Sequence, residues 1–514
     1  MTAALLDPIL GATSAGELVT DPARTDLYRH DVYATGPAPL AVLRPTSVES
    51  LARGVGAATA AGIAIVPRGG GLSYTGGYLG PDAPFVLVDT AALTQIIDIN
   101  ETDMTVTVEC GITWAALAAV LKPKGLRVKA WGTLSGINAT VGGGMSQNGV
   151  FWGAGNGTVV DSAISFDVVL ADGTVLTTGN PFFRPYGPDL TGLFAADCGA
   201  FGIKARATLR LVREGPAFAY GSFAFDTPEG VFGAMGAIAR EGLASECFGF
   251  DPFLQSQRMK RDSLTSDAKS LVNMMKAQGS VFKALKEGAK VAMAGRSFLD
   301  DVPFSLHVIT ERRRQADADG DMAEIIRIVE GLGGKAIENT IPKILRANPF
   351  PPVNSMVGPA GERWVPVHGF LPSSKLVEGW AAIQQLFADN ADEMAAHGVQ
   401  SGALLAVVSN QASLIEPVFF WPEELNPLHR HAVESAHLSK LKGFPANPAA
   451  SALVARLRGE LITLFQSLGA IHVQVARSYP LKEAHQPEGW AALQALKKQL
   501  DPKGLMNPGV LGLL

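Results

Sequence analysis

The amino-acid sequence predicts an α/β or α+β protein with more than one domain, and three observations support this. Short apolar segments of strand length alternate with alanine-rich segments of helix length in the first 180 residues. The 56 glycines and 32 prolines gather in a few loops between these segments, without a period. A chain of 514 residues is long enough for two to four domains, at ~100–200 residues each.

The first elements follow from the apolar pattern and its boundary residues. We expect a buried strand at 40–45 and a helix over 51–61, with Thr46 as the N-cap and Glu49 completing a capping box. A second strand at 63–67 leads directly into a glycine-rich loop. This order of elements is typical of a nucleotide-binding domain.

The next elements follow the same alternation. Strands are predicted at 85–90 and 105–110, and a helix over 114–125 ends at a proline and a glycine. A second glycine-rich region, 132–157, leads into a hairpin whose turn is Asp172-Gly173.

The composition changes after about residue 215. Residues 255–345 contain long helical stretches, and the charged run 311–314 is expected on a solvated helix face. The apolar run that begins at Gly402 has the length of a strand. His429 and His431 diverge if they lie on a helix, so a surface helix is favoured over a metal site.

Charge and hydropathy exclude several functions. The chain has 43 Lys and Arg against 48 Asp and Glu, so the clustered positive charge that binds nucleic acid is not expected. No apolar run approaches the ~20 residues of a transmembrane segment, and the N-terminus lacks a basic secretory region. The three cysteines form no CxxC pair, so a cytoplasmic protein is expected.

The glycine-rich loop 68–80 is predicted to bind a diphosphate. Three successive glycines, 69–71, allow backbone N–H groups to converge, and Ser73 and Thr75 add hydroxyl donors. Taken alone, this loop is also compatible with a tight structural turn. It contains neither the G-x-G-x-x-G of a dinucleotide fold nor a Walker motif, so NAD and ATP are disfavoured.

The second glycine-rich region has the same character. Glycines 142–144 stand beside the hydroxyls of Thr133, Ser135 and Thr140. Two such regions in one ~200-residue unit are hard to explain as turns, because that many glycines weaken a fold unless the backbone must approach something closely. A large ligand with a polyphosphate and flat ends is therefore favoured.

Five motifs in this order resemble those of a known flavoprotein family. They are PRGGGLSYTGG from Pro67, ATVGGGMSQNG from Ala139, VVLADGTVL from Val168, GAFGIKARATLRL from Gly199 and DPKGLMNPGVLG from Asp501. They are similar to the FAD-binding fold of the vanillyl-alcohol-oxidase and glycolate-oxidase-type flavoproteins, the PCMH-type FAD-linked oxidases. The resemblance covers most of residues 35–215 and the last 30 or so residues.

The resemblance implies an α+β architecture with a two-subdomain FAD-binding domain and a cap domain, whose antiparallel sheet is flanked by helices. The implied boundaries are 1–215 for the FAD-binding domain, 216–484 for the cap, and 485–514 for a C-terminal segment that returns to the FAD domain. FAD is the implied cofactor, with the pyrophosphate at 68–75 and the adenine side near Ile203. The implied FAD-binding residues are Pro67, Arg68, Gly69, Gly70, Gly71, Leu72, Ser73, Thr75, Gly76, Thr133, Leu134, Ser135, Thr140, Gly143, Gly202, Ile203, His368 and Asn507.

His368 is the candidate for a covalent bond to the flavin. In some relatives a histidine of the first loop forms this bond, but Leu72 stands at that place here, and the second region has no cysteine for another linkage. The stretch RWVPVHGFLP from Arg363 resembles the strand that carries the linking histidine in vanillyl alcohol oxidase. The alternative is FAD held noncovalently, with His368 as an ordinary strand residue.

Candidate catalytic residues lie in two later segments. Residues 471–480 alternate as a strand would, which places Arg477 and Tyr479 on one face and His472 on the other. An arginine–tyrosine pair suits a phenolate or a carboxylate equally well. Glu416 stands among large apolar residues, where a carboxylate can act as a base with a raised pKa, although an edge glutamate is the plainer interpretation.

The predicted function is an FAD-dependent oxidoreductase that passes a hydride from a C–H bond of a small substrate to flavin N5, with reoxidation by dioxygen or an electron acceptor. An aromatic or benzylic alcohol is favoured as the substrate. The alternatives are a D-2-hydroxy acid dehydrogenase and a noncatalytic FAD-carrying electron-transfer subunit. The family's G-H-x-G-D-G-N-x-H metal motif is absent, so no metal is expected, and a homodimer is among the expected assemblies.

Overall fold

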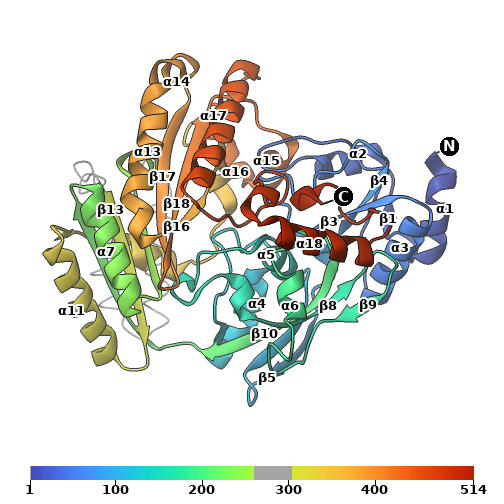
Figure 1. Cartoon of the computed structure of the whole chain (residues 1–514), viewed down its shortest axis with the longest axis horizontal. Coiled ribbons are helices and arrows are strands. Elements are labelled where there is room, and N and C mark those ends of the chain that lie inside the picture. Colours follow the sequence, from blue (N-terminus) through green and yellow to red (C-terminus); the bar gives the residue numbers. More distant parts are fainter. Residues whose placement is uncertain (1, 260–303, 514) are drawn as a thin grey trace.

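The computed structural model describes residues 2–259 and 304–513, and the described chain forms three β-sheets (Figure 1). The two smaller sheets and the C-terminal helix lie together on one side, and the largest sheet with its helices forms the other side. In these ranges no helix has the length and apolar character needed to cross a membrane.

The first sheet has four strands in the order β1-β2-β4-β3 and is mainly parallel. Its strands are β1 (Leu18–Val19), β2 (Ala41–Leu43), β4 (Phe85–Asp89) and β3 (Ala64–Arg68). Helices α1 (Thr2–Ala12) and α3 (Val48–Ala60) pack against each other beside it, and the short α2 (Pro22–Thr25) precedes β2. β2 and β4 are buried at every position, as parallel strands covered on both faces are.

The N-cap of helix α3 lies one residue later than the sequence predicts, at Ser47 and not at Thr46, and the helix itself begins at Val48, ahead of the predicted 51. The Ser47 Oγ accepts the N–H of Ser50 at 3.1 Å. Thr46 Oγ1 instead donates to Glu17 Oε1 at 2.6 Å, and Glu17 is buried and receives several further donors. Thr46 bonds to Glu17, 29 residues away, and therefore does not cap the helix. The residues around Thr46 do not indicate this distant contact.

The second sheet is antiparallel, in the order β5-β6-β10-β8-β9, with β7 also paired to β10. Its strands are β5 (Ile96–Asn100), β6 (Thr105–Glu109), β10 (Ile203–Arg213), β8 (Ala163–Val169), β9 (Val175–Thr177) and β7 (Leu126–Val128). The predicted hairpin is confirmed as β8 and β9. Helices α4 (Trp114–Leu121), α5 (Val141–Gln147) and α6 (Leu190–Phe194) accompany this sheet.

The third sheet belongs to the cap and is antiparallel, in the order β14-β11-β13-β12-β17-β18-β15, with β16 also paired to β18. Its strands are β14 (Lys335–Ala336), β11 (Ala217–Phe225), β13 (Phe304–Arg312), β12 (Glu246–Phe250), β17 (Gln400–Val408), β18 (Ala412–Trp421), β15 (Arg363–Pro366) and β16 (Gly369–Pro372). Alternate residues face opposite ways along each strand. On β17, for example, Leu405 packs into the helix-covered core, while Leu404 and Ala406 face the FAD-binding side.

Helices cover one face of the cap sheet (Figure 1). They include α7 (Pro228–Glu241), α11 (Gln315–Gly331), α13 (Leu376–Asp389), α14 (Ala391–His397) and α17 (Pro448–Ser467). The shorter helices of this half are α8 (Pro252–Met259), α12 (Thr340–Ala347), α15 (Pro427–Ala432) and α16 (Ser435–Leu438). Of the helices expected over 255–345, those between 260 and 303 lie outside the described residues.

The charged run 311–314 does not form a solvated helix face, so that prediction is wrong. Glu311 and Arg312 end strand β13, and Arg314 precedes α11. Only 6% of the Glu311 side chain is exposed, and its carboxylate pairs with Arg127 at 3.1 Å and lies 3.8 Å from Arg346. The pattern of charges alone could not show that Glu311 meets two partners from other elements.

The C-terminal segment returns to the first sheet. After α18 (Pro487–Leu500), Met506 lies alongside Ile65 of β3 in a parallel bridge. The Ile65 N–H donates to Leu505 O at 2.8 Å, and the Asn507 N–H donates to Ile65 O at 2.7 Å. The last residues therefore extend the sheet beside the strand from which the first glycine loop leaves.

Residues 471–480 do not form the predicted strand. Ile471 makes an isolated bridge to Phe370, and beyond it the backbone turns, with Gln474 at φ 52° and Ala476 at φ 42°. Left-handed backbone breaks the alternation on which the predicted faces depended. The segment instead follows the FAD-binding side, where the Gln474 N–H donates to Gln147 O at 2.7 Å.

Candidate active site

A cavity of about 300 Å³ lies between the glycine-rich loops and the cap sheet. Its wall contains most of the residues that the sequence assigned to FAD. These are Pro67, Arg68, Gly69, Gly70, Gly71, Leu72, Ser73, Thr133, Leu134, Ser135, Thr140, Gly143, Gly202, Ile203 and His368. Glu416 also lines it, so one cavity joins the predicted cofactor loops to the cap.

Buried polar groups fix the backbone of the first glycine loop. Its backbone turns at Gly71, where φ is +73°, and the Tyr78 hydroxyl donates to Gly71 O at 2.8 Å. The Arg68 guanidinium lies 4.9 Å from the ring centre of Tyr28, and its buried Nε has no hydrogen-bond partner. Asp31 accepts the Gly76 N–H at 2.8 Å, which fixes the far end of the loop.

The second glycine region packs directly against the first. Thr140 caps α5 and accepts the Gly143 N–H at 3.1 Å. A Cβ on Gly69 would lie 2.4 Å from Thr140 Oγ1, and one on Gly70 would lie 2.1 Å from Asn138 O. Real Cβ contacts are not that short, so both positions require glycine and leave backbone facing the cavity.

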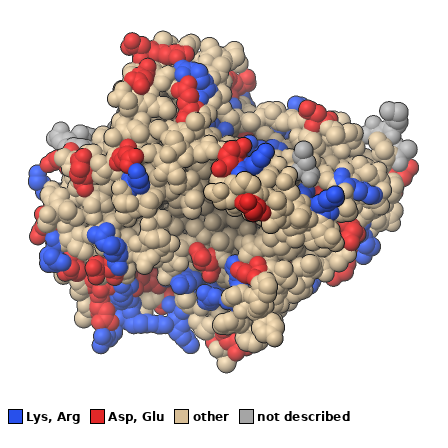
Figure 2. All heavy atoms as spheres, in the orientation of Figure 1, with Lys and Arg blue, Asp and Glu red and all other residues tan. Residues whose placement is uncertain are grey.

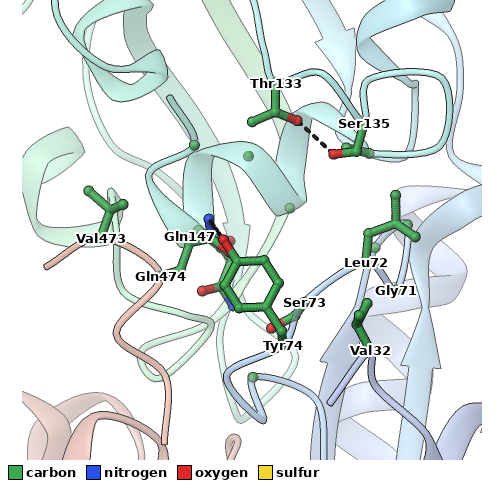
Figure 3. A pocket seen from close by; sticks show the side chains of 18 of the residues that line it. Val32, Gly71, Leu72, Ser73, Tyr74, Thr133, Ser135, Gln147, Val473 and Gln474 are labelled. Atoms are coloured by element: carbon green, nitrogen blue, oxygen red, sulfur yellow. Dashed lines mark hydrogen bonds between the residues drawn. The ribbon is translucent and has the colours of Figure 1, made fainter. Parts of the chain in front are cut away.

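These features fit a dinucleotide such as FAD. Backbone without side chains allows close approach of a diphosphate, and the orphaned Arg68 Nε is a buried donor on the same wall. The hydroxyls of Thr133 and Ser135 are hydrogen-bonded to each other at 2.8 Å, and both residues line the cavity near the start of the second glycine-rich region (Figure 3). We propose that the loops hold the diphosphate in this way.

The third glycine cluster contributes a buried cation that sequence reasoning missed. Lys204 lines the cavity, and its Nζ contacts Asp197 Oδ1 at 2.5 Å and Ser146 Oγ at 2.9 Å. Side-chain exposure is only 1% for Lys204 and 0% for Asp197, so this ion pair is removed from water. The signal was in the motif itself, because Lys204 is the one charged residue inside GAFGIK.

The residues of β17 and β18 that line the cavity are apolar except for one carboxylate. They come from the same face of the two strands, and they are Leu404, Ala406, Leu414, Glu416, Val418 and Phe420. Glu416 stands directly opposite Leu404 in the antiparallel register. The plain interpretation as an edge glutamate is wrong, because β18 is paired on both sides, with β17 and with β15 and β16.

His368 occupies the break between β15 and β16, opposite the centre of β18. Pro417 lacks an N–H and cannot donate to the ladder at this point. Val367 still donates to Pro417 O at 2.8 Å, and pairing resumes at Gly369. This interruption turns the His368 ring toward Glu416, with His368 Nδ1 3.9 Å from Glu416 Oε2.

The His368 imidazole is neutral and has a defined tautomer. Its Nε2 lies 2.7 Å from Val473 O, and because a carbonyl only accepts, Nε2 carries the proton. Burial lowers the pKa of His368 to about 3, since an imidazolium there would be desolvated. Nδ1 therefore presents a lone pair, and it has no hydrogen-bond partner.

We expect acid precipitation to release all of the flavin from the wild-type protein into the supernatant. The Nε2 of His368 is already engaged with Val473, and the free Nδ1 faces Glu416. Absorbance near 450 nm, measured in the pellet and the supernatant, checks this. Colour retained in the pellet and lost in His368→Ala would contradict it and would place a covalent bond at Nδ1.

Tyr74 of the first loop reaches toward the cap. Its hydroxyl accepts a hydrogen bond from Gln474 Nε2 at 2.9 Å, and Figure 3 shows this pair beside Gln147. Its ring meets Trp364 edge-on at 5.7 Å and His368 at 6.3 Å between centroids. Burial raises the pKa of Tyr74, so its hydroxyl keeps its proton. Sequence reasoning missed it, although it stands inside the first motif.

Tyr479 and His472 support His368 and do not line the cavity. The His368 N–H donates to the Tyr479 hydroxyl at 3.1 Å, and His472 Nδ1 donates to His368 O at 2.6 Å. The two supporting rings are stacked, with centroids 4.1 Å apart. Together they fix the backbone of His368 from behind.

Arg477 and Asn507 likewise lie behind the wall. Arg477 Nη2 donates to Asn507 Oδ1 at 3.1 Å and to Pro508 O at 2.7 Å. Asn507 Nδ2 donates to Gly77 O and Cys198 O, at 3.0 and 2.9 Å. Arg477 and Tyr479 are thus not brought together as a substrate-binding pair. Thr75 and Gly76 also fall outside the lining residues.

The helix predicted around His429 and His431 is present as α15 (Pro427–Ala432), but only His431 of the two lies on the surface. His429 is fully buried, and its Nδ1 lies 2.7 Å from Asn426 Oδ1. Burial lowers its pKa to about 3. His431 is exposed, and across residues 2–259 and 304–513 no three His, Cys, Asp or Glu side chains gather as metal ligands would.

Comparison with known protein families identifies two matching segments. Residues 39–179 match the model of the FAD binding domain, and residues 474–511 match the C-terminal domain of FAD linked oxidases. The second match starts at Gln474, ahead of the boundary predicted at 485, and includes Arg477 and Asn507.

Curated relatives match only part of the chain. The glycolate oxidase subunit GlcD of Bacillus subtilis is 31% identical over 176 residues, which are 34% of this chain and 37% of that protein. A probable mitochondrial D-lactate dehydrogenase of Danio rerio is 36% identical over 155 residues, 29% of this chain and 30% of that protein. The chain thus spans about a third of the length of these two relatives.

Solved structures match nearly the whole chain at low identity. p-Cresol methylhydroxylase with substrate bound has a TM-score of 0.74 at 16% identity and covers 99% of this chain and 96% of its own. Alkyldihydroxyacetonephosphate synthase has a TM-score of 0.71 at 15% identity, over 98% of this chain and 85% of its own. These likenesses confirm the predicted α+β fold with its cap.

Proposed function

Because the chain carries the FAD-binding domain and the C-terminal domain of the FAD-linked oxidases, we propose that it is an FAD-dependent oxidoreductase acting on a small organic substrate. FAD is its cofactor. The proposed function rests on one observation, a cavity that is lined both by the glycine loops and by residues of the cap sheet. We call the part of this cavity next to the cap sheet the chamber. A cofactor on the loops and a substrate at the cap would meet there.

The chain's own residues supply binding and shielding. When bound, FAD supplies a two-electron acceptor for a hydride. Apolar residues of β17 and β18 keep water from the reacting carbon, and Trp364 and Tyr74 close the chamber on the side of the first loop. The supports behind His368 hold one polar group at a fixed place in this wall.

A neutral aromatic or benzylic alcohol fits the chamber best. The cavity wall offers aromatic and aliphatic surface from Phe151, Trp364, Val418 and Phe420. Among the described lining residues the cations are Arg68 and Lys204, and both belong to the glycine-rich side. The described cap residues that line the cavity are mainly apolar, with Glu416 and His368 as the ionisable side chains among them.

A D-2-hydroxy acid is the second candidate. The relatives named as glycolate oxidase and D-lactate dehydrogenase favour it. Among the described lining residues, Arg68 and Lys204 are the cations that could bind the substrate carboxylate, and Lys204 is already paired with Asp197.

We expect anaerobic addition of benzyl-type alcohols to bleach the flavin absorbance of the purified protein, whereas glycolate and D-lactate leave it unchanged. Stopped-flow spectra near 450 nm, recorded with dithionite reduction as the full-scale reference, check this. Bleaching by the hydroxy acids alone would favour the second candidate. A flavin that dithionite reduces but that no alcohol or hydroxy acid bleaches would instead indicate an electron-transfer subunit.

A further inference from the structure

We propose that Arg363 and Arg458 are positioning residues of the cofactor site, which hold the first glycine loop against the cap and thereby slow the release of FAD. Both arginines belong to the cap, and neither is among the described residues that line the cavity. The inference goes beyond the proposed function, because it concerns retention of the cofactor and not the substrate. It rests on that function in one respect, which is that FAD occupies the cavity.

The two arginines meet the FAD-binding domain at one corner, which we define as residues 31–33 and 73–76. The two segments of the corner are bonded to each other, since the Val32 N–H donates to Ser73 O at 2.9 Å. Val32 and Ser73 both line the cavity. Contacts that hold the corner therefore also hold part of the cavity wall.

Arg458 reaches the corner from helix α17. Its Nη2 donates to Tyr74 O at 3.1 Å and to Ser478 Oγ at 3.0 Å, and the residue is only 8% exposed. Ser478 belongs to the segment that matches the C-terminal domain of FAD linked oxidases. The same segment holds the next residue of the loop, because the Arg477 N–H donates to Thr75 O at 3.0 Å. One guanidinium thus joins a cap helix, the first glycine loop and the C-terminal segment.

Arg363 reaches the same corner from strand β15. Its Nη2 donates to Val32 O at 3.0 Å and to Tyr33 O at 2.7 Å. The preceding carbonyl is also taken by the cap, because Asn426 Nδ2 donates to Asp31 O at 2.8 Å. Three successive backbone carbonyls of the FAD-binding domain are therefore bound by side chains of the cap.

Two aromatic rings connect the arginines to each other. The guanidinium of Arg458 lies 4.6 Å from the ring centre of Tyr33, and that of Arg363 lies 5.5 Å from the ring centre of Trp421. The Tyr33 and Trp421 rings meet edge-on, with centroids 6.2 Å apart. Each cation thus lies on a ring that packs against the ring under the other cation, so the loss of one guanidinium loosens the support of the other.

The partners of the two guanidinium groups indicate positioning more than stabilisation. Within residues 2–259 and 304–513, their hydrogen bonds go to carbonyl and hydroxyl oxygens, and no carboxylate forms an ion pair with either group. Removing a cation from water costs free energy that such partners return only in part. What the contacts do provide is a fixed place for the backbone of the corner.

The corner restrains the loop that we propose for the diphosphate. Residues of both the loops and the cap line the cavity, so FAD bound there lies between the two. To release the dinucleotide, glycines 69–71 must move away from it, and the corner follows these glycines closely in the chain. While Arg458 holds Tyr74 O, this end of the loop cannot move away from the cap. We therefore expect the two arginines to slow the release of FAD.

The experiment measures the rate at which the FAD-loaded protein releases its cofactor after dilution, from the rise in flavin fluorescence. Arg458→Gln and Arg363→Gln should each release FAD about tenfold faster than the wild type, because each loses hydrogen bonds from a charged donor. Arg458→Lys should release it about threefold faster, since an ammonium keeps the charge over Tyr33 but lacks the planar fork that serves two oxygens.

Arg456→Gln is the matched control. Arg456 lies on the same helix, but its side chain pairs with Glu393 and Glu460 at the surface. This variant should release FAD at the wild-type rate. If it releases FAD as fast as Arg458→Gln does, the effect belongs to the helix as a whole, and the proposal is overturned.

A double variant tests whether the two arginines act together. Independent contacts would multiply, so Arg363→Gln with Arg458→Gln would release FAD about a hundredfold faster than the wild type. Because both hold one corner, we expect a rate close to that of the faster single variant. A hundredfold increase would contradict the joint action.

The stability of the apoprotein separates positioning from a purely structural role. A structural role would lower the midpoint of thermal unfolding of the apoprotein and leave the rate of FAD release unchanged, and this result would overturn the proposal. If the glutamine variants do not fold, Arg458→Lys decides, and release at the wild-type rate in that variant overturns the proposal as well. Unchanged rates remove this inference alone, whereas a wild-type protein that takes up no FAD removes the proposed function with it.

Discussion

Replacing Gly70 with alanine is expected to yield a protein that is isolated without FAD. The added Cβ would lie 2.1 Å from Asn138 O, 2.9 Å from the carbonyl carbon and 3.1 Å from Ala139 Cα. All three are backbone atoms of the second glycine region, so no side chain can rotate out of the way. The two loops must separate, and the backbone surface that we propose for the diphosphate is lost.

The ratio of flavin to protein absorbance after purification measures this effect directly. We expect less than a tenth of the wild-type ratio for Gly70→Ala, and no recovery when micromolar FAD is added. Gly459→Ala is the matched control, because Gly459 lies in helix α17 with nothing within 4 Å of its added Cβ. If Gly70→Ala is isolated with as much flavin as the wild type, the first loop is not part of the flavin-binding site.

Replacing Lys204 with methionine should destabilise the protein by about 3–5 kcal/mol, because it leaves the buried Asp197 carboxylate without its cation. Asp197 retains the Gly199 N–H at 2.9 Å, but its Oδ2 has no partner even in the wild type. For 514 residues this corresponds to a fall of roughly 3–5 °C in the midpoint of thermal unfolding, from ~2.1 cal/mol/K of unfolding entropy per residue.

A second substitution identifies the cause. Lys204→Met with Asp197→Asn removes the uncompensated charge, so the double variant should regain most of the lost stability. Unfolding followed by circular dichroism, with flavin content recorded beside it, checks both. If Asp197→Asn gives no recovery, the contribution of Lys204 lies in the cavity wall and not in the ion pair.

Local sequence features predicted much of the fold. The strands 64–68, 85–89 and 105–109 follow from apolar runs and alternation, and the β8–β9 hairpin from its Asp-Gly turn. The glycine clusters led to the prediction of cofactor-binding loops, which stays a prediction, for a related reason. Gly69 and Gly70 cannot carry a side chain, because another loop approaches them too closely. Such close contacts between loops are common around a bound ligand.

The errors arise where a distant partner decides the local structure. Thr46 had the pattern of an N-cap, but Glu17 binds it. Residues 471–480 alternated like a strand, yet they follow the FAD-binding side with left-handed turns, held by partners such as Gln147 and Thr75. The spacing of neighbouring residues in the sequence does not indicate any of these long-range contacts.

The pairing of His368 with Glu416 could not be predicted for the same reason. Both residues were singled out, one as a site of covalent attachment and the other as a base beside aromatic side chains. Their proximity depends on the register of β16 on β18 and on the break that Pro417 helps to create. Register between strands 48 residues apart is set by the whole sheet, so single-sequence patterns do not contain it.

The bridge between Ile65 and Met506 has a consequence for how the molecule is made in the cell. The sheet that carries the first glycine loop gains its last neighbour only when the ribosome has synthesised residue 507 and that stretch has left the exit tunnel. Asn507 then joins the carbonyls of Gly77 and Cys198, two segments translated long before. The proposed flavin site is thus completed only after residue 507 has been translated, and a nascent chain arrested before Asn507 should not retain the coenzyme.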